Sequence, residues 1–266
     1  MFEFAFDQAA GLRASAPVLP ARVLPVAATA QPAQGYELLC RLAGCLATPD
    51  QPVVIVDASA RESQRRTVDE GRHLGLLQVL RDPSVSGLGR PADQAEWLVL
   101  PGALGLQALA GTAATVGPAV ALSRLLVPFA AGALVLLYGP AQGLSGLFGG
   151  TAVPVMVPLV AQPQASMDAY ASVKRLHGAG LRPVLAPLAE AGASPAFGRV
   201  QDTVVDCARR HLLLELECWP AATWGHRALE AAVAAPGRSA ASSMMEHQIL
   251  DITRSDRRVH AHFSWS

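Results

Sequence analysis

Lysine is almost absent from this chain of 266 residues: only one of its 21 basic residues is a lysine, Lys174. The 21 basic residues are balanced by 21 acidic ones, so the formal net charge is zero and the pI is about 7.1. Surfaces that bind nucleic acid need an excess of positive charge. The charge balance therefore argues against nucleic acid as a partner.

Cysteine pairs and a secretion signal are missing too. The cysteines form no CxxC pair and have no histidine at ligand spacing, which argues against a disulfide scaffold or a metal site. The chain has four of them, at Cys40, Cys45, Cys207 and Cys218. We expect them to be buried thiols in a reducing compartment. The N-terminus carries Glu3 and Asp7 instead of a basic and then apolar run, so we expect no signal peptide and a cytoplasmic location.

A long stretch without charge raises the question of a membrane protein. No charged residue occurs from Leu125 to Met167, and a spanning helix needs about 20 apolar residues. Prolines and glycines interrupt this stretch, among them Pro128, Pro140, Pro154, Pro158, Gly143, Gly146, Gly149 and Gly150. Buried strands of a parallel sheet also read as continuous apolar runs, because both of their faces are covered. A globular α/β protein is the favoured interpretation, and a membrane or structural protein is the alternative.

Short apolar segments alternate with helical segments along the chain. The predicted strands are Arg22–Ala27, Pro52–Asp57, Trp97–Gly102, Ala133–Tyr138, Val153–Val160, Arg182–Ala186 and Leu213–Cys218. The predicted helices include Tyr36–Ala47, Gly75–Leu80, Leu104–Gly111, Pro118–Ala131, Ser166–His177, Pro195–His211, Arg227–Ala234 and Ser239–Leu250. This alternation predicts an α/β fold with a mostly parallel sheet that helices cover on both faces.

The domain organisation follows from the linkers. No Ser/Gly-rich or charged linker divides the chain after its first twenty residues, so we expect one α/β domain over residues 21–266. A short helix over Phe4–Ser15 precedes this domain. Pro17 and Pro20 end that helix, because proline cannot continue a helical hydrogen-bond ladder. Residues 1–20 are therefore predicted to be a separate helix on a proline-containing tether.

The strand, loop and helix at Arg22–Ala47 occupy the position where an α/β chain usually carries a phosphate-binding loop. Such a loop needs glycines for close approach of the backbone to the ligand and a lysine for the β- and γ-phosphates. The loop Thr29–Gly35 has one glycine and no lysine. The scaffold therefore suggests a nucleotide-binding protein, whereas the residues indicate that the nucleotide site is lost.

Three motifs carry a resemblance to a known family. Residues 7–13 read DQAAGLR, residues 162–174 read QPQASMDAYASVK, and the segment Leu98–Leu106 places a Pro-Gly turn after a strand. The first matches the N-terminal DQAxxLR motif, and the second the EPTxxxDAYxxxK segment, of the FlhG family (also FleN or YlxH). The matched positions of the second are Gln162, Pro163, Asp168, Tyr170 and Lys174. The chain thus resembles FlhG-type members of the MinD/ParA class of P-loop ATPases over most of residues 4–215.

The departures from that family concern the nucleotide. The resemblance implies a glycine-rich loop with two lysines, a metal-associated carboxylate where Tyr138 stands, and a glutamate where Gln162 stands. A Mg-nucleotide needs anionic oxygens for the metal and a cation for the phosphates. Both sets are replaced, so we expect a pseudo-ATPase without ATP, Mg²⁺ or any other metal. We place the degenerate site at Thr29, Ala30, Gly35, Tyr36, Asp57 and Tyr138.

The family also implies a function. Its members regulate flagellar number and placement, and the N-terminal helix resembles an activator of FlhF, a signal-recognition-type GTPase. By this resemblance Gln8 would orient the water or the γ-phosphate, Asp7 would cap the helix, and Leu12 and Arg13 would dock it. The implied partners are an FlhF-like GTPase and flagellar basal-body components. We expect a monomer without strong membrane binding, because the apolar stripe of the C-terminal segment is short.

Several of these residues also have a purely structural interpretation. The Asp168–Lys174 segment is also typical of a helix N-terminus with a solvated face, and Asp57 of a cap or turn residue at a strand end. His260 and His262 lie in a polar tail and read as surface residues. An active MinD-type ATPase with an atypical phosphate loop is the alternative function.

Overall fold

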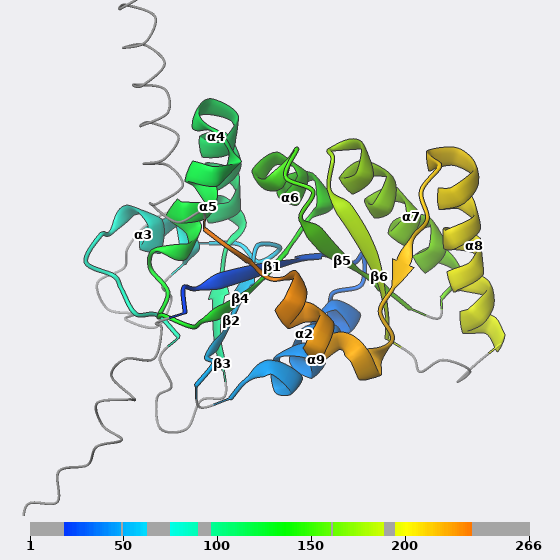
Figure 1. Ribbon diagram of the computed structural model, residues 1–266, viewed down its shortest axis with the longest axis horizontal. Helices are drawn as coiled ribbons and strands as arrows, with labels where there is room; N and C mark the ends of the chain where they lie inside the picture. The colour runs from blue at the N-terminus through cyan, green and yellow to red at the C-terminus, as the bar shows by residue number, and fades with distance from the viewer. Residues whose placement is uncertain are drawn as a thin grey trace, which may run out of the picture. The chain divides into compact units, whose positions relative to one another are not determined.

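The computed structural model describes residues 19–48, 50–62, 75–89, 97–160, 162–188 and 195–235 (Figure 1). The chain divides into two units, residues 1–234 and 235–266, and every element described below belongs to the first. The predicted helices Phe4–Ser15 and Ser239–Leu250 lie outside the described residues. The same is true of the DQAxxLR motif, with Asp7, Gln8, Leu12 and Arg13.

One eight-stranded sheet organises the described part of the chain, and its strand order is β3-β2-β4-β1-β5-β6-β7 with β8 beside β1. The strands are β1 Arg22–Ala27, β2 Val53–Asp57, β3 Trp97–Pro101, β4 Leu134–Gly139, β5 Pro154–Leu159, β6 Arg182–Pro187, β7 Glu217–Cys218 and β8 Val233–Ala234. All pairs are parallel except β1 with β8. The prediction of a mostly parallel sheet is confirmed.

Helices cover both faces of this sheet. They are α2 Pro32–Leu46, α3 Leu76–Arg81, α4 Ala103–Val116, α5 Pro118–Leu126, α6 Ala141–Phe148, α7 Pro163–Gly178, α8 Pro195–Leu212 and α9 Trp224–Ala231, with a 3₁₀ turn at Ala221–Thr223. Helices α2 and α9 lie together on one face (Figure 1), where Leu38, Leu42 and Trp224 pack with the sheet residues Leu24 and Leu136.

The opposite face is covered by other helices. Side chains alternate between the two faces of a strand, so Gly139 faces away from the side on which its neighbour Tyr138 packs. Leu106 of α4 and Leu144 of α6 lie next to Gly139 there. Every residue of β4 and β5 is buried, which explains the long stretch without charge that contains both strands. No helix in the described part of the chain is long and apolar enough to cross a membrane.

The structure corrects several element boundaries. The helix predicted at Tyr36–Ala47 is α2 and begins at Pro32, and the helix predicted at Leu104–Gly111 is α4 and runs on to Val116. The predicted strand Leu213–Cys218 is reduced to two residues, because α8 runs on to Leu212 and Leu213 then adopts a left-handed φ of 54°. The predicted helix Arg227–Ala234 begins earlier and ends at Ala231, and the next residues form β8. The helix predicted at Pro118–Ala131 is α5 and ends at Leu126, which is consistent with the proline at position 128.

The prediction of buried cysteines is wrong. Cys40 and Cys45 are exposed, and Cys207 and Cys218 are half-buried; all four are free thiols. The exposure of the first two follows from the rotation of α2. The leucines of α2 at positions 38, 39, 42 and 46 fill its buried side, so the cysteines between them face solvent.

Candidate functional site

The candidate site lies at the edge of the sheet where the parallel strands β1, β2 and β4 end. The register pairs Ala27 with Gly139 and Asp57 with Tyr138, so the ends of these strands meet. The β1–α2 loop leaves this edge at Ala28, whose N–H donates to the Gly139 carbonyl at 2.7 Å. The structure therefore brings the predicted loop, Asp57 and Tyr138 together.

Tyr138 fills the space beneath the β1–α2 loop. Its side chain is 1% exposed, and its hydroxyl oxygen accepts a hydrogen bond from the Thr29 N–H at 3.1 Å. Backbone N–H groups of a loop in this position are the usual donors to phosphate oxygens. In this chain, one of these donors is already satisfied by a tyrosine of the neighbouring strand.

Gly35 is the one glycine of the predicted phosphate loop, and the structure gives it a different role. It lies in the first turn of α2, and a Cβ at this position would come within 2.0 Å of the Tyr138 hydroxyl oxygen. No real Cβ approaches an atom so closely, so a larger residue would displace the tyrosine or the helix. Gly35 therefore allows the ring of Tyr138 to pack against α2.

Asp57 is the buried carboxylate of the site, at 1% exposure. Its Oδ1 accepts hydrogen bonds from the N–H and hydroxyl of Ser59, at 2.9 and 2.6 Å, and from the Ala60 N–H at 3.2 Å. Its Oδ2 accepts the hydroxyl of Tyr36. Both carboxylate oxygens thus have hydrogen-bond donors within the protein. The bonds of Oδ1 to Ser59 and Ala60 are those of a turn residue at a strand end, which is the structural interpretation given above for Asp57.

Tyr36 closes the outer side of the site. The hydrogen bond to Asp57, followed by burial and by the negative charge of Asp57, raises the pKa of Tyr36 to about 12. The centroids of the Tyr36 and Tyr138 rings are 6.3 Å apart, with the ring planes inclined by 45°. We call Tyr36, Asp57 and Tyr138, together with the Thr29 N–H, the tyrosine cluster.

The tyrosine cluster itself contains no basic side chain. All of its members are neutral or acidic, and Lys174 lies exposed on α7. Among the described residues, no group of three or more His, Cys, Asp or Glu side chains could hold a metal ion. Chemically, the cluster can order the loop and the first turn of α2.

The second predicted segment lies beside the cluster, at the start of α7. Gln162 is the N-cap residue of α7, and its Oε1 accepts a hydrogen bond from the side-chain amide of Gln31 in the β1–α2 loop. Pro163 is the first residue of the helix, a position where its missing N–H costs nothing. Asp168 and Ala30 line a small pocket between the loop and α7. Tyr170 is half-buried farther along the helix, outside this pocket.

Several polar residues of this edge were not predicted from the sequence. They include Gln31, Gln34, Ser59 and Glu62. The Glu62 carboxylate accepts the Leu77 N–H of α3 and the Gly105 N–H of α4, each at 2.7 Å, and so joins the first turns of two helices. The signal in the sequence for this role of Glu62 is its place in the short polar segment after Asp57, since carboxylates cap helix N-termini.

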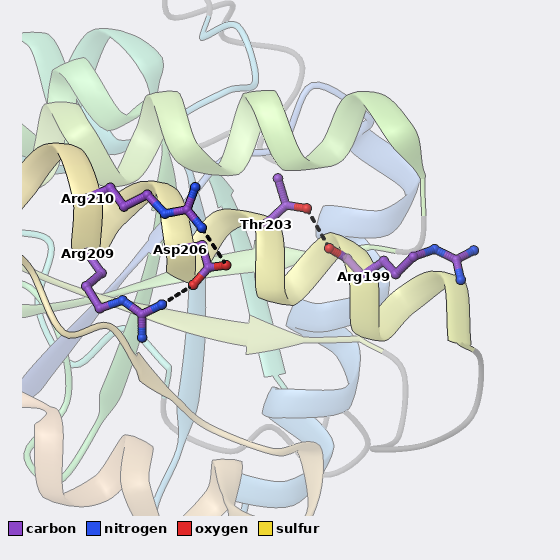
Figure 2. A network of polar contacts seen from close by, with 5 residues as sticks. All are labelled: Arg199, Thr203, Asp206, Arg209 and Arg210. Atoms are coloured by element: carbon purple, nitrogen blue, oxygen red, sulfur yellow. Dashed lines mark hydrogen bonds and ion pairs between the residues drawn. The ribbon is translucent and has the colours of Figure 1, made fainter.

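A different kind of polar network lies on α8, away from this edge. Figure 2 shows Asp206 between the guanidinium groups of Arg209 and Arg210, and the Thr203 hydroxyl donating to the Arg199 carbonyl at 2.7 Å. The side chains of the ion pairs are between 42% and 70% exposed. Exposed pairs at these helical spacings stabilise a protein only slightly, so this network is an ordinary solvated helix face.

The observed class is thus an α/β protein with a mostly parallel sheet, whose first strand leads through a loop into a helix at the carboxyl edge. Solved structures similar to the chain include apo McdA from Cyanothece, at 15% identity over 77% of this chain and 90% of that one, with a TM-score of 0.49. An ATP complex of a McdA variant from the same source matches at 16% identity over 76% and 82%, with a TM-score of 0.48.

The MinC:MinD cell division protein complex of Aquifex aeolicus is also similar, at 11% identity over 79% of this chain and 86% of that one, with a TM-score of 0.44. No protein-family model matches the sequence, and no curated protein matches it. Similarity at these levels does not assign the chain to a family.

Proposed function

We propose that the chain is a non-catalytic regulator of the MinD/ParA class that resembles FlhG and acts on an FlhF-like GTPase in flagellar placement. The observation that carries the non-catalytic part is the tyrosine cluster, which occupies the strand edge where such proteins would hold a nucleotide. The activator part comes from the DQAxxLR motif at residues 7–13.

A Mg-nucleotide does not fit the residues of this edge. The Thr29 N–H is already bonded to Tyr138, and both oxygens of Asp57 have donors within the protein. Phosphates also need a nearby cation, and the tyrosine cluster contains none. We therefore infer that the protein neither binds nor hydrolyses Mg-ATP. We also infer that it is a monomer. A ligand stabilises only the state that it binds, so ATP should not drive dimer formation, and the mass in solution should be the same with and without ATP.

The proposed activity belongs to the N-terminal helix. Gln8 would reach the composite site of the GTPase, where its amide can donate to a phosphate oxygen and accept from the attacking water. A residue supplied in trans can raise a GTPase rate by several orders of magnitude. Leu12 and Arg13 would hold the helix on the partner, and the α/β body would position it.

Single-turnover GTP hydrolysis by the FlhF of the same organism tests this proposal. The full-length protein should accelerate hydrolysis, and Gln8→Ala should remove most of the acceleration while leaving binding within a few fold. Leu12→Ala should instead weaken binding. Gln107→Ala is the matched control, because it removes an exposed glutamine of α4 and should change neither quantity.

Two results would contradict the activator role. One is a wild-type protein that binds the GTPase without accelerating it at any concentration. The other is a Gln8→Ala variant that accelerates hydrolysis as well as the wild type does.

A further inference from the structure

The outer side of helix α5 is largely apolar, although it is exposed to solvent. The inner side of α5 packs into the core through the leucines at positions 122, 125 and 126. On the outer side, Val120 is 50% exposed, and Val127 is 77% exposed. Val127 directly follows α5 and keeps a helical φ of −52° and ψ of −40°. Arg124 is four residues after Val120 and three before Val127, so all three share one side of the helix. We call these three residues the α5 face.

The α5 face lies in a part of the molecule that is poor in charge. Arg124 is the one charged residue from Trp97 to Met167. Its guanidinium donates to the Thr112 hydroxyl of α4 at 3.1 Å and, within the described residues, makes no ion pair. Helix α4 packs beside α5 (Figure 1) and carries no charged residue. Exposed helix faces normally carry several charges, as α8 does in Figure 2, and an exposed apolar face is typical of an interaction surface.

The N-terminal segment of the chain is attached close to the α5 face. The Gly132 N–H donates to the Leu19 carbonyl at 2.7 Å, so residues 1–18 extend from this point. The loop Pro128–Ala131 joins Gly132 to Val127, and these two residues are therefore at most about 18 Å apart. A segment that is tethered so near to a surface has a high effective concentration there. The N-terminal segment is thus the occupant that the α5 face meets first.

The predicted helix Phe4–Ser15 has side chains that match the α5 face. Phe4, Gln8 and Leu12 are spaced four residues apart, so they share one side of that helix. Asp7 follows Phe4 by three residues and borders the same side. A helix of this length extends over about 18 Å, which is enough to cover the outer side of α5. Its two apolar side chains complement the valines, and its carboxylate complements the single cation.

We propose that the α5 face binds the predicted N-terminal helix of the same chain. In the docked state Phe4 and Leu12 cover the valines of the α5 face, and Asp7 pairs with Arg124. Gln8 lies on the covered side of the helix, so docking withholds it from other proteins. This withholding rests on the proposed GTPase-activating function, whereas the docking itself does not.

Hydrogen–deuterium exchange of the full-length protein, measured without any GTPase, tests the docking. An isolated helix of about 12 residues is marginal in water, so slow exchange of the backbone amides of residues 5–14 reports docking. We expect these amides to exchange about tenfold more slowly in the wild type than in Val120→Asp, which places a charge in the apolar face. Met167→Asp makes the same kind of change at a 65% exposed residue of α7; it is the matched control and should exchange like the wild type.

A charge reversal tests the pairing of Asp7 with Arg124. Arg124→Glu should speed exchange of the same amides, because two carboxylates then face each other. Asp7→Arg in the Arg124→Glu background should restore slow exchange. The docking is overturned if these amides exchange in the wild type as in an unstructured chain, or if Val120→Asp leaves their exchange unchanged. The ion pair is overturned if the double variant exchanges as fast as Arg124→Glu alone.

Addition of the FlhF-like GTPase tests the withholding of Gln8. Val120→Asp should reach half-maximal acceleration of GTP hydrolysis at a concentration roughly five- to tenfold below that of the wild type, because a helix that is free in only a fraction of the molecules binds with a correspondingly weakened apparent affinity. Equal concentrations for the two proteins would overturn the withholding. If neither protein accelerates hydrolysis while the exchange data show docking, the docking stands and the proposed activator function is wrong.

Discussion

Two parts of the carboxyl edge differ in whether their buried polar atoms have hydrogen-bond partners. At β1, β2 and β4, the polar atoms of the tyrosine cluster satisfy one another: Tyr138 accepts from Thr29, and Asp57 accepts from Ser59, Ala60 and Tyr36. In the first turn of α2, by contrast, the buried side-chain oxygen Oε1 of Gln34 has no hydrogen-bond donor among the described residues.

This difference predicts how substitutions at the two places change the stability of the protein. A polar site whose partners all come from the protein contributes to stability and gains little from a ligand. A buried acceptor without a donor lowers stability, because its lost hydration is not compensated. We therefore expect substitutions in the tyrosine cluster to destabilise the protein, and removal of the unsatisfied side-chain oxygen of Gln34 to leave its stability unchanged or raise it.

Tyr138→Ala should have the largest effect on stability. It removes a fully buried aromatic side chain from between β4 and α2, and such truncations leave a cavity that costs about 3–5 kcal/mol. Urea denaturation followed by circular dichroism measures the free energy of unfolding. Tyr170→Ala, at a half-buried tyrosine of α7, is the control and should cost clearly less; equal losses would mean that Tyr138 has no special place in the packing.

Gly35→Ala should be the next largest, because its Cβ would overlap the Tyr138 hydroxyl. Overpacking of this kind costs about 1–3 kcal/mol. Gly44→Ala, on the same helix with open space around its Cβ, should instead stabilise the protein by roughly 0.5–1 kcal/mol through helix propensity.

A double variant sharpens this result. In the Tyr138→Ala background, Gly35→Ala should no longer destabilise, since the atoms that it would overlap are gone. If the cost of Gly35→Ala is the same in both backgrounds, the contact between Gly35 and Tyr138 is not what requires the glycine.

Tyr36→Phe should cost about 1 kcal/mol near neutral pH, through loss of its hydrogen bond to Asp57. The folded-state pKa of Tyr36 is raised to about 12 from its ordinary value of 10.0. The bond therefore stabilises the protein fully below pH 10, and this stabilisation is lost as the pH rises through 12. Denaturation at a series of pH values from 8 to 12 should give a smaller alkaline loss for Tyr36→Phe than for the wild type; parallel losses would refute the assignment.

Gln34→Met should have the smallest effect and the opposite sign. It replaces a buried oxygen without a donor by an unbranched apolar group of similar length, so the free energy of unfolding should stay unchanged or rise by up to about 1 kcal/mol. A loss as large as that of Tyr36→Phe would remove the contrast between the two parts of the edge.

Much of the fold could be predicted from the sequence, because it follows from local pattern. The apolar runs at Arg22–Ala27 and Pro52–Asp57 became strands at or within a residue of the predicted bounds. The strand β8 escaped prediction because two residues carry no periodic signal, and its antiparallel pairing with β1 joins segments that are far apart in the chain.

The site could be predicted only in part. The missing lysine and the tyrosine at the end of β4 are visible in the sequence, and the structure brings Tyr138 to the loop as expected. The bond between Tyr36 and Asp57 depends on the rotation of α2 about its axis, which residue types alone do not specify. Likewise, the exposure of Cys40 and Cys45 follows from packing by leucines at neighbouring positions of the helix.

Isothermal titration of the full-length protein with ATP and Mg²⁺ tests most directly whether the tyrosine cluster closes the nucleotide site. We expect no heat beyond that of dilution, because the loop donor, the carboxylate oxygens and the space beneath the loop are already occupied by the protein. A saturable isotherm with a micromolar dissociation constant would contradict this account.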